Sequence, residues 1–305
     1  MNFSNLNSIA NYIVENGKGI LAADESNPTC KKRFDTISVE STEENRRDYR
    51  QLLFQAEGMS NNIGGVILFD ETIRQNTADG TALVDLIKQK EALPGIKVDK
   101  GLAPFENSDI EKVTQGIEDL DARCAEYFKM GALFTKWRAV ISIGKTLPSQ
   151  GCIEENAKLL ARYAKIVQKN NMVPIVEPEV LMDGSHSVEE CYDATSRTLK
   201  SLFQNLEEEN VDITGTILKP NMVTPGSEHQ EKISVETVAK ETLRCLHECV
   251  PDNLPAITFL SGGQSETVST EHLDAMNKIG GFPWKLSFSY GRALQAGALK
   301  AWLGK

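Results

Sequence analysis

No apolar run in this 305-residue sequence approaches the roughly 18 residues that a membrane-spanning helix needs. Its first residues also lack the basic segment and apolar core of a secretion signal. Acidic residues outnumber Lys and Arg by 43 to 33, so there is no surplus of positive charge for nucleic acid. The six cysteines are scattered, which is typical of reduced thiols. We therefore expect a cytoplasmic protein that binds neither membranes nor nucleic acid.

Histidine is scarce as well, and its placement argues against a metal site. None of the four histidines stands at the end of a predicted strand, and no two are spaced i, i+4. The one suggestive group is Cys245, His247 and Cys249. On a helix His247 points away from the two cysteines, so buried structural thiols are the simpler interpretation. We expect no metal and no other cofactor.

Eight short apolar, β-branched segments alternate with longer stretches of helical periodicity, such as residues 156–167. The predicted strands cover residues 18–24, 64–69, 95–99, 134–140, 173–179, 215–219, 256–261 and 285–290. Eight β-then-α units predict an α/β protein with a (β/α)₈ TIM barrel. No linker rich in Pro, Gly or Ser divides the chain, so we expect a single domain over residues 1–305.

A doubly wound dinucleotide-binding sheet is the rival topology. It would require G-x-G-x-x-G after the first strand, where this sequence instead reads AADES at residues 22–26. A Walker A motif is also missing. The barrel is therefore the preferred fold.

Polar or charged residues stand at the C-terminal ends of seven of the eight predicted strands, the end at which barrel enzymes carry out chemistry. Three strands carry charged pairs spaced i, i+2, whose members face the same side of the sheet. These pairs are Lys97 with Asp99, Lys136 with Arg138, and Glu177 with Glu179. One such charge is usually a solvated loop residue. Burying so many costs several kcal/mol each unless they are paired or used, so we interpret the cluster as an active site.

The fourth, fifth and sixth strands should bring two lysines and two glutamates together. Consecutive strands are neighbours in such a barrel, so Lys136, Glu177, Glu179 and Lys219 should lie side by side. Cationic neighbours favour the neutral amine, which is the form that attacks a ketone. The glutamates can transfer protons as an imine forms. Lys219 follows an apolar run and is the preferred nucleophile, with Lys136 as the alternative.

Two anion-binding sites are predicted at the mouth of the barrel. The loops after the last two strands, Ser261-Gly262-Gly263 and Ser289-Tyr290-Gly291-Arg292, combine glycine N–H groups, hydroxyls and an arginine. A second site could form from Ser26, Thr29, Arg33 and Lys97. Two anion sites beside an amine indicate a bisphosphate substrate of modest length.

Nine segments resemble class I fructose-bisphosphate aldolases, and the similarity runs from the first helix to residue 305. They are GKGILAADES, STEENRRDYRQLLF, IGGVILFDET, GIKVDKG, KWRAV, VPIVEPEV, TGTILKPNMVTPG, FLSGGQSE and FSYGRALQAGALKAW. The resemblance implies reversible cleavage of fructose 1,6-bisphosphate to dihydroxyacetone phosphate and glyceraldehyde 3-phosphate through a lysine Schiff base, without a metal. It also implies a cytoplasmic enzyme of glycolysis and gluconeogenesis that is usually a homotetramer and can contact actin.

The resemblance also implies residue roles. Lys219 in ILKPNM would form the Schiff base, and Glu177 in VEPE, beside Glu179, would be the acid and base for imine formation. Asp24 in AADES would take the proton of the C4 hydroxyl. Lys136 and Arg138 in KWR would contact the substrate. The C1 phosphate would be held by Ser261, Gly262, Gly263, Ser289 and Arg292. The C6 phosphate would be held by Ser26, Thr29 and Lys97, with Arg33 nearby; Thr29 replaces a serine of the family and keeps its hydroxyl.

One departure and two alternatives accompany this resemblance. Family members continue past the last barrel helix into a segment whose final tyrosine helps to protonate the enamine, whereas this sequence ends at Lys305. We therefore expect either a fragment or a protein that works without that segment. A purely structural role, such as binding actin, would not require the intact set of charged residues. Transaldolase, another Schiff-base barrel, would need only one phosphate site.

Overall fold

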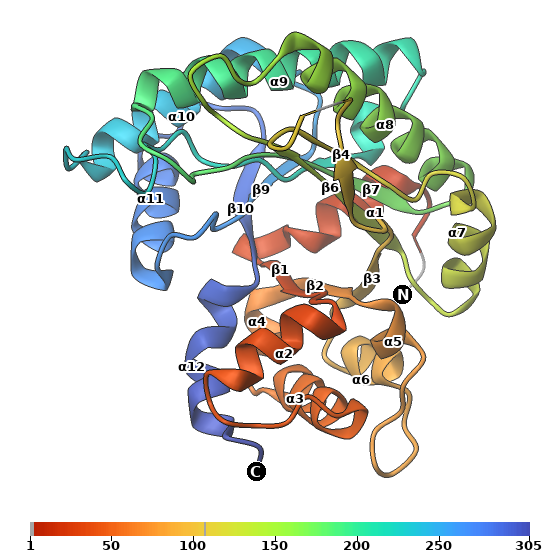
Figure 1. The fold of residues 1–305 in the computed structure, drawn as a ribbon. Coiled ribbons are helices and arrows are strands. Elements are labelled where there is room, and N and C mark those ends of the chain that lie inside the picture. The colour runs from red at the N-terminus through yellow and green to blue at the C-terminus, as the bar shows by residue number, and fades with distance from the viewer. Residues whose placement is uncertain (1–2, 107) are drawn as a thin grey trace.

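The computed structural model describes residues 3–106 and 108–305, and in it eight parallel strands close into a barrel (Figure 1). The eight barrel strands in chain order are β1 (Gly19–Ala23), β2 (Ile63–Leu68), β3 (Leu93–Lys97), β6 (Phe134–Ile141), β7 (Val173–Val180), β8 (Ile217–Leu218), β9 (Ala256–Phe259) and β10 (Lys285–Tyr290). Each pairs with its neighbours in the chain, and β10 closes the barrel on β1. The predicted (β/α)₈ barrel is confirmed. The predicted single domain also includes residues 1–2 and 107, which lie outside the described residues.

The strand that precedes Lys219 is shorter than predicted. Residues 213–215 form a 3₁₀ turn, η2 (Ile213–Gly215), and only Ile217 and Leu218 count as strand. The N–H of Lys219 still donates to the carbonyl of Val176 at 2.8 Å. Pro220 has no N–H to continue the ladder, so the regular strand ends there.

Helices surround the barrel, and side-chain caps fix where several of them begin. They are α1 (Leu6–Ile13), α2 (Asn27–Asp35), α3 (Glu43–Gln55), α4 (Met59–Asn62), α5 (Asp70–Ile73), α6 (Leu83–Gln89), α7 (Leu120–Lys129), α8 (Gln150–Lys169), α9 (Val188–Glu208), α10 (Val235–Cys249), α11 (Glu266–Ile279) and α12 (Arg292–Trp302), with the 3₁₀ turn η1 (Glu15–Gly17) after α1. The α9 helix begins with a capping box between Ser187 and Glu190. The α8 helix is capped by Ser149, whose Oγ accepts from the N–H of Cys152.

A small hairpin interrupts the alternation of strand and helix and was not predicted. Its strands β4 (Leu102–Pro104) and β5 (Lys112–Thr114) pair antiparallel in the long connection from β3 to α7. The hydroxyl of Thr114 donates to the carbonyl of Arg138 at 2.7 Å. The hairpin is therefore anchored to β6, beside the mouth of the barrel.

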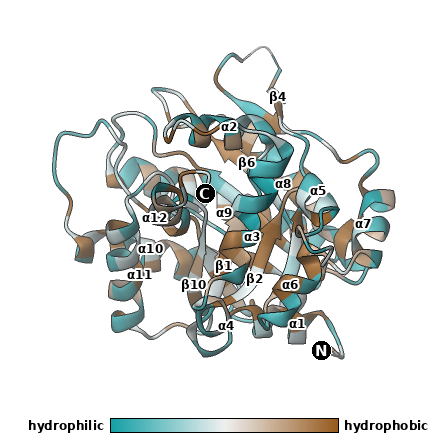
Figure 2. Cartoon of the chain, turned by 90° about the horizontal axis from the view of Figure 1, so that it is seen from below, coloured by the Kyte–Doolittle hydropathy of each residue, from teal (hydrophilic) through white to brown (hydrophobic). Residues whose placement is uncertain are grey.

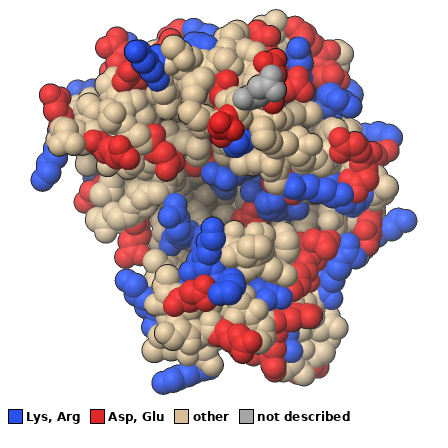
Figure 3. All heavy atoms as spheres, viewed as in Figure 1, with Lys and Arg blue, Asp and Glu red and all other residues tan. Residues whose placement is uncertain are grey.

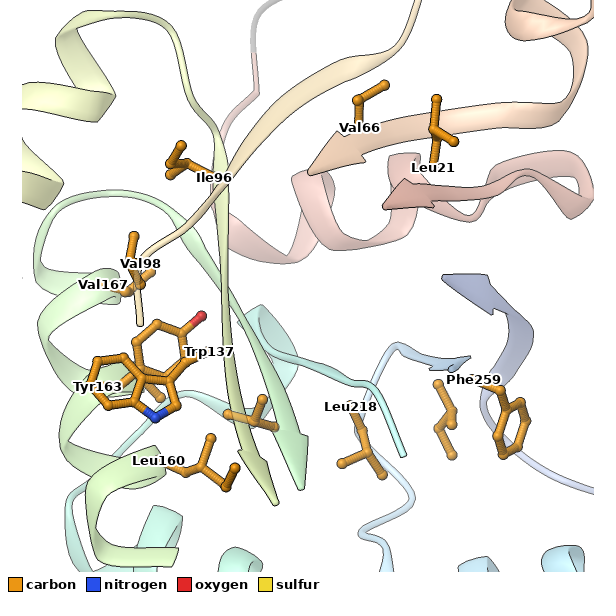
Figure 4. Packing of buried hydrophobic residues seen from close by; sticks show 14 of the residues in the cluster. Leu21, Val66, Ile96, Val98, Trp137, Leu160, Tyr163, Val167, Leu218 and Phe259 are labelled. Carbon is orange, nitrogen blue, oxygen red and sulfur yellow. The ribbon is translucent and has the colours of Figure 1, made fainter. Parts of the chain in front are cut away.

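The hydrophobic core has an outer layer between the strands and the helices. In this layer Trp137 of β6 lies against Tyr163 of α8, with ring centroids 5.4 Å apart (Figure 4). Apolar residues gather on the strands and on the inward faces of the helices, while the outer faces are polar (Figure 2). Among residues 3–106 and 108–305, none of the helices combines the length and apolar character that crossing a bilayer requires.

A second apolar layer fills the amino-terminal end of the barrel. Ile9, Ala10 and Ile13 of α1 pack with interior residues of the strands. The contact is close, because a Cβ atom at Gly64 would lie only 2.0 Å from the carbonyl oxygen of Ile13. The α1 helix therefore closes this end, and the polar residues lie at the other.

Candidate active site

A cavity of about 1110 Å³ opens at the carboxyl ends of the barrel strands. Figure 3 shows a hollow near the middle of this face with Lys and Arg atoms around it. Every predicted site residue except Gly263 lines the cavity, and Gly263 follows directly after the lining residue Gly262. The sequence therefore predicted where the strand ends converge. The role of each residue is a separate question, which their geometry addresses.

Four charged groups form the centre of the cavity. Lys219 Nζ lies 3.0 Å from Oε1 of Glu177, and Lys136 Nζ lies 3.3 Å from Oε2 of the same carboxylate. Lys136 Nζ also lies 2.7 Å from Oδ2 of Asp24. Lys136, Glu177 and Lys219 are each at most 4% exposed. Two lysines and two carboxylates thus lie close together with little exposed surface, which strengthens their interactions.

Lys136 is held in its charged form. Burial would lower the pKa of Lys136, but Asp24, Glu177 and Asp99 outweigh burial and raise it above its usual value. The same ion pairs also change the pKa values of the two acids. Burial would raise the pKa of Asp24, but the charges of Lys136 and Lys219 lower it to about 2. Burial likewise opposes the charge of Glu177, and the two lysines lower its pKa.

Lys219 has fewer acidic neighbours than Lys136. Within 4.0 Å, and among residues 3–106 and 108–305, Glu177 supplies its single carboxylate contact, whereas Lys136 has three. Its backbone is held by the Val176 carbonyl. Beyond Pro220, where the strand ends, the side chain of Asn221 continues the contact with β7, because its Oδ1 accepts from the N–H of Val180 at 3.0 Å. The geometry therefore favours Lys219 over Lys136 as the amine that can react.

A ring of further ion pairs surrounds this centre. Arg138 pairs with Glu179, and burial, which opposes its charge, is outweighed by Glu179 and Glu177, so the pKa of Arg138 is raised. Lys97 Nζ lies 2.5 Å from Oδ1 of Asp99, whose other oxygen is 4.0 Å from Lys136 Nζ. Asp99 thus separates two lysines that are register partners on β3 and β6.

The loops after β9 and β10 combine features that suit a phosphate. Gly262 and Gly263 adopt φ values of 55° and 88°, a left-handed conformation that glycine adopts readily and that allows a tight turn beside the cavity. Ser289 Oγ is buried and has no hydrogen-bond partner among the described residues. No carboxylate of the described chain lies within 4.0 Å of the exposed Arg292. These groups leave an arginine and a hydroxyl available to an anion.

The polar groups of the second predicted anion site already have partners within the protein. Ser26, Thr29, Arg33 and Lys97 all line the cavity, but Arg33 pairs with Glu25 and Lys97 with Asp99. The hydroxyls of Ser26 and Thr29 lie 3.1 Å apart and bond to each other. An anion here must therefore compete with the two carboxylates for the cations.

A buried polar network behind Asp24 was missed by sequence reasoning. Gln295 of α12 donates through Nε2 to the carbonyl of Ala22 at 2.8 Å and to Glu25 at 3.0 Å. Arg50 of α3, only 1% exposed, donates to the Glu25 carbonyl at 2.7 Å. A signal existed for Arg50, since the helical period places it on the buried face of α3 with Tyr49.

In residues 3–106 and 108–305, no three His, Cys, Asp or Glu side chains are grouped so that they could hold a metal ion. Cys245 and Cys249 are buried in α10. The ring of His247 lies against Trp284 at a centroid distance of 5.3 Å, in agreement with the interpretation that it points away from the two thiols.

Comparisons with known proteins agree on one family. A family model described as "Glycolytic: Fructose-bisphosphate aldolase class-I" matches residues 5–305. A probable fructose-bisphosphate aldolase class 1 of Xanthomonas campestris is 52% identical over 302 residues, which cover 99% of this chain and 90% of that protein. The cytosolic fructose-bisphosphate aldolase 4 of Arabidopsis thaliana is 52% identical over 297 residues, 97% of this chain and 76% of the relative.

The fold agrees with these sequence matches. A solved structure of fructose-bisphosphate aldolase from Plasmodium falciparum, in complex with TRAP and a small-molecule inhibitor, has a TM-score of 0.97 and is 50% identical in sequence. The similarity covers 98% of this chain and 87% of the solved one. The chain therefore belongs to the class I fructose-bisphosphate aldolases, lyases of glycolysis that reversibly cleave fructose 1,6-bisphosphate to dihydroxyacetone phosphate and glyceraldehyde 3-phosphate through a lysine Schiff base.

Proposed function

We propose that Lys219 forms the Schiff base and that Glu177 transfers the protons of imine formation. The observation that carries this proposal is the carboxylate of Glu177 between the two lysines, 3.0 Å from Lys219 Nζ and 3.3 Å from Lys136 Nζ. Lys136, beside three carboxylates, remains charged and is a poor nucleophile. Lys219 lies at the end of an apolar strand and has one carboxylate to receive its proton.

The imine steps use both oxygens of Glu177. Lys219 first passes a proton to Oε1 of Glu177, and its neutral amine then attacks C2 of the open-chain ketone. The proton that the attacking nitrogen releases moves to the C2 oxygen and gives the carbinolamine. The carboxyl group then protonates the C2 hydroxyl, which leaves as water and gives the iminium ion. Oε2 lies 3.3 Å from Lys136 Nζ and accepts no hydrogen bond from the described residues, so it has capacity to bond to the intermediate. Lys136 stabilises the carboxylate between these transfers.

Asp24 carries out the cleavage step in this proposal. Its carboxylate is ionised, since its pKa is lowered to about 2 by the neighbouring lysines, and so it can accept the proton of the C4 hydroxyl. The C3–C4 bond breaks, glyceraldehyde 3-phosphate leaves, and the electron pair enters the iminium to form an enamine on Lys219. Protonation at C3 and hydrolysis by water then release dihydroxyacetone phosphate and free the amine.

The remaining predicted residues bind the substrate. We propose that the C1 phosphate is held by Ser261, Gly262, Gly263, Ser289, Gly291 and Arg292. The C6 phosphate is held by Ser26, Thr29, Arg33 and Lys97. Arg138 and its partner Glu179 contact the sugar between them. Within residues 3–106 and 108–305 the Ser289 hydroxyl has no hydrogen-bond partner and Arg292 no carboxylate partner, and these two features support the first assignment.

Finer properties follow from the family and belong to the same proposal. The iminium ion withdraws electrons from C2 without a Lewis acid, so the reaction needs no metal. Relatives in Arabidopsis thaliana and Spinacia oleracea are named as cytosolic or cytoplasmic enzymes, and we place this one in the cytoplasm. A homotetramer, with actin as a further contact, is the assembly that the family resemblance implies.

Borohydride trapping tests the central assignment. The protein is incubated with dihydroxyacetone phosphate, reduced with borohydride, digested and mapped by mass spectrometry. The adduct is expected on Lys219 and should be missing from Lys219→Met, while the surface variant Lys158→Met should label as the wild type does. An adduct on Lys136 or Lys97 in the wild type would overturn the assignment.

A further inference from the structure

The loop after β9 holds its shape through the side chain of Gln264. The backbone N–H of Gln264 donates to the carbonyl of Ser261 at 2.9 Å and closes a turn over Gly262 and Gly263. Two glycines in left-handed conformations make this turn intrinsically mobile in the absence of other contacts. The side chain of Gln264 is half-buried and does not line the cavity, so its contacts lie behind the loop.

The amide of Gln264 bridges two parts of the protein. Its Oε1 lies 2.6 Å from Nδ1 of His272, which stands on α11 and is 6% exposed. Its Nε2 donates to the sulfur of Met222 at 3.7 Å. Met222 is itself 1% exposed and follows Lys219 by three residues. Gln264 therefore joins the proposed phosphate loop to the segment that carries the proposed Schiff-base lysine.

His272 determines which way this amide points. A carbonyl oxygen cannot donate, so the hydrogen bond requires the proton on Nδ1 of the imidazole. Burial lowers the pKa of His272, which favours the neutral ring, and the contact with Oε1 then assigns its one proton to Nδ1. Because His272 takes Oε1, the Nε2 group of Gln264 is left directed at Met222. The interaction sets the amide orientation and, through it, the link to Met222.

We propose that His272 is a positioning residue for the phosphate loop of this enzyme, acting through Gln264. It lines no part of the cavity and touches no reacting atom. Its effect is to order the Ser261–Gly263 turn against the segment after Lys219, so that the backbone N–H groups are in place before a phosphate arrives. The inference rests on the proposed assignment of this loop to the C1 phosphate.

Four variants test the inference: His272→Leu, His272→Asn, Gln264→Leu and the double variant Q264L/H272L. Asparagine keeps a donor near the position of Nδ1, whereas leucine has a similar volume and none. The readouts are the inhibition constant of inorganic phosphate against fructose 1,6-bisphosphate, KM and kcat. Loss of one ordering hydrogen bond should raise the inhibition constant and KM of His272→Leu about fivefold, with kcat within about twofold of the wild type.

The other variants distinguish positioning from general packing. The inhibition constant of phosphate and the KM of His272→Asn should stay within about twofold of the wild-type values, a smaller change than the loss of one hydrogen bond causes. Gln264→Leu should raise the inhibition constant of phosphate and KM as much as His272→Leu does. The double variant should raise them no further than either single variant, because the two side chains act as one unit. Equal losses in His272→Leu and His272→Asn, or an unchanged phosphate constant in folded His272→Leu, would overturn the inference.

Two further measurements keep the result interpretable. Thermal unfolding shows whether each variant is folded, and Gln264→Leu provides the same comparison if His272→Leu does not fold. Borohydride trapping on the wild type reports separately on Lys219. A missing adduct there would contradict the proposed function, whereas a phosphate constant that does not respond to these variants would contradict only the role of His272.

Discussion

Lys136 and Asp24 meet across the inside of the barrel, with Nζ of the lysine 2.7 Å from Oδ2 of the aspartate. Their strands are not neighbours, because β2 and β3 lie between β1 and β6 in the sheet. The lysine also contacts Glu177 and Asp99, so one ammonium group faces three carboxylates. The charge state of the proposed cleavage base and that of the proposed imine acid are therefore set by the same residue.

Replacing Lys136 by Met should separate its electrostatic role from that of the nucleophile. Without the ammonium group, the pKa of Asp24 and that of Glu177 should rise, and kcat/KM should fall by about 10²–10⁴. Borohydride should still trap dihydroxyacetone phosphate on Lys219, although more slowly. Steady-state kinetics and adduct mapping measure both effects. A folded Lys136→Met protein that forms no adduct would assign the imine to Lys136 instead.

Asp24→Asn should block cleavage and spare imine formation. Asparagine keeps the shape of the side chain but cannot accept the C4 proton, so turnover of fructose 1,6-bisphosphate should fall by about 10²–10⁴. The reduced adduct with dihydroxyacetone phosphate should form to the same extent as in the wild type, because that ligand has no C4 hydroxyl to deprotonate. Equal losses in cleavage and in trapping would show that Asp24 acts before the carbon–carbon bond breaks.

The stability of the protein should depend on pH through Asp24. The folded-state pKa of Asp24 is about 2, below the ordinary value of 3.8. Such a lowering stabilises the fold by about 2 kcal/mol at neutral pH. For an acid with a depressed pKa this contribution is complete above the ordinary pKa and is lost as the pH falls through about 2.

The comparison of Asp24→Asn with the wild type isolates this contribution from other acids. Urea unfolding at several pH values should show that the free energy of unfolding of the wild type exceeds that of the variant by about 2 kcal/mol at pH 6. This difference should be roughly halved at pH 3. Acids elsewhere in the chain titrate in both the variant and the wild type, so their contributions cancel in this difference. A difference that stays constant between these pH values would mean that Asp24 is not the group that titrates.

Gln295→Leu should destabilise the protein and slow cleavage together. The substitution removes two buried hydrogen bonds, to the Ala22 carbonyl and to Glu25, and their loss costs about 1–3 kcal/mol. Since Ala22 lies two residues before Asp24, kcat should fall as well. Gln204→Leu is the matched control, because Gln204 is exposed and its side chain hydrogen-bonds to one partner, Glu208, within the part of the chain that the structure describes. Equal effects of the two variants on unfolding would contradict the role of Gln295.

Chelation should leave the reaction unchanged. If the iminium on Lys219 is the electron acceptor, prolonged dialysis against EDTA removes nothing that the cleavage needs. The measurement is the rate of fructose 1,6-bisphosphate cleavage before and after dialysis, with a zinc-dependent enzyme treated in parallel as the control. Activity that disappears with EDTA and returns with zinc would contradict the proposed chemistry.

The strands and the location of the cavity could be predicted because both follow from local patterns. Alternation of apolar runs with helical periods identified eight strands, and the i, i+2 spacing of Glu177 and Glu179 placed both carboxylates on the inner side. The shortening of β8 was less visible, although Pro220 marks where its ladder must stop. These features depend on residues that are close together in the chain.

The ion pairs and buried networks could not be predicted in the same way. The sequence around Arg33 does not indicate a partner for its charge, and in the structure it pairs with Glu25, eight residues earlier. Gln295 contacts a carbonyl 273 residues away, and no pattern near Gln295 indicates that partner. Likewise, nothing about His272 in a helix predicts that it bonds to the loop eight residues before it. Partner choice depends on how the barrel closes.

Within residues 3–106 and 108–305, the helix α1 closes one end of the barrel, so the cavity opens at the other. Ile9, Ala10 and Ile13 fill the amino-terminal end, and within the described chain Lys136 and Lys219 are reached from the carboxyl ends of the strands. Substrate, both three-carbon products and the water that hydrolyses the imine must therefore use one route, in turn. A molecule that rests at the entrance would slow arrival, departure and hydrolysis together, without touching a single reacting atom.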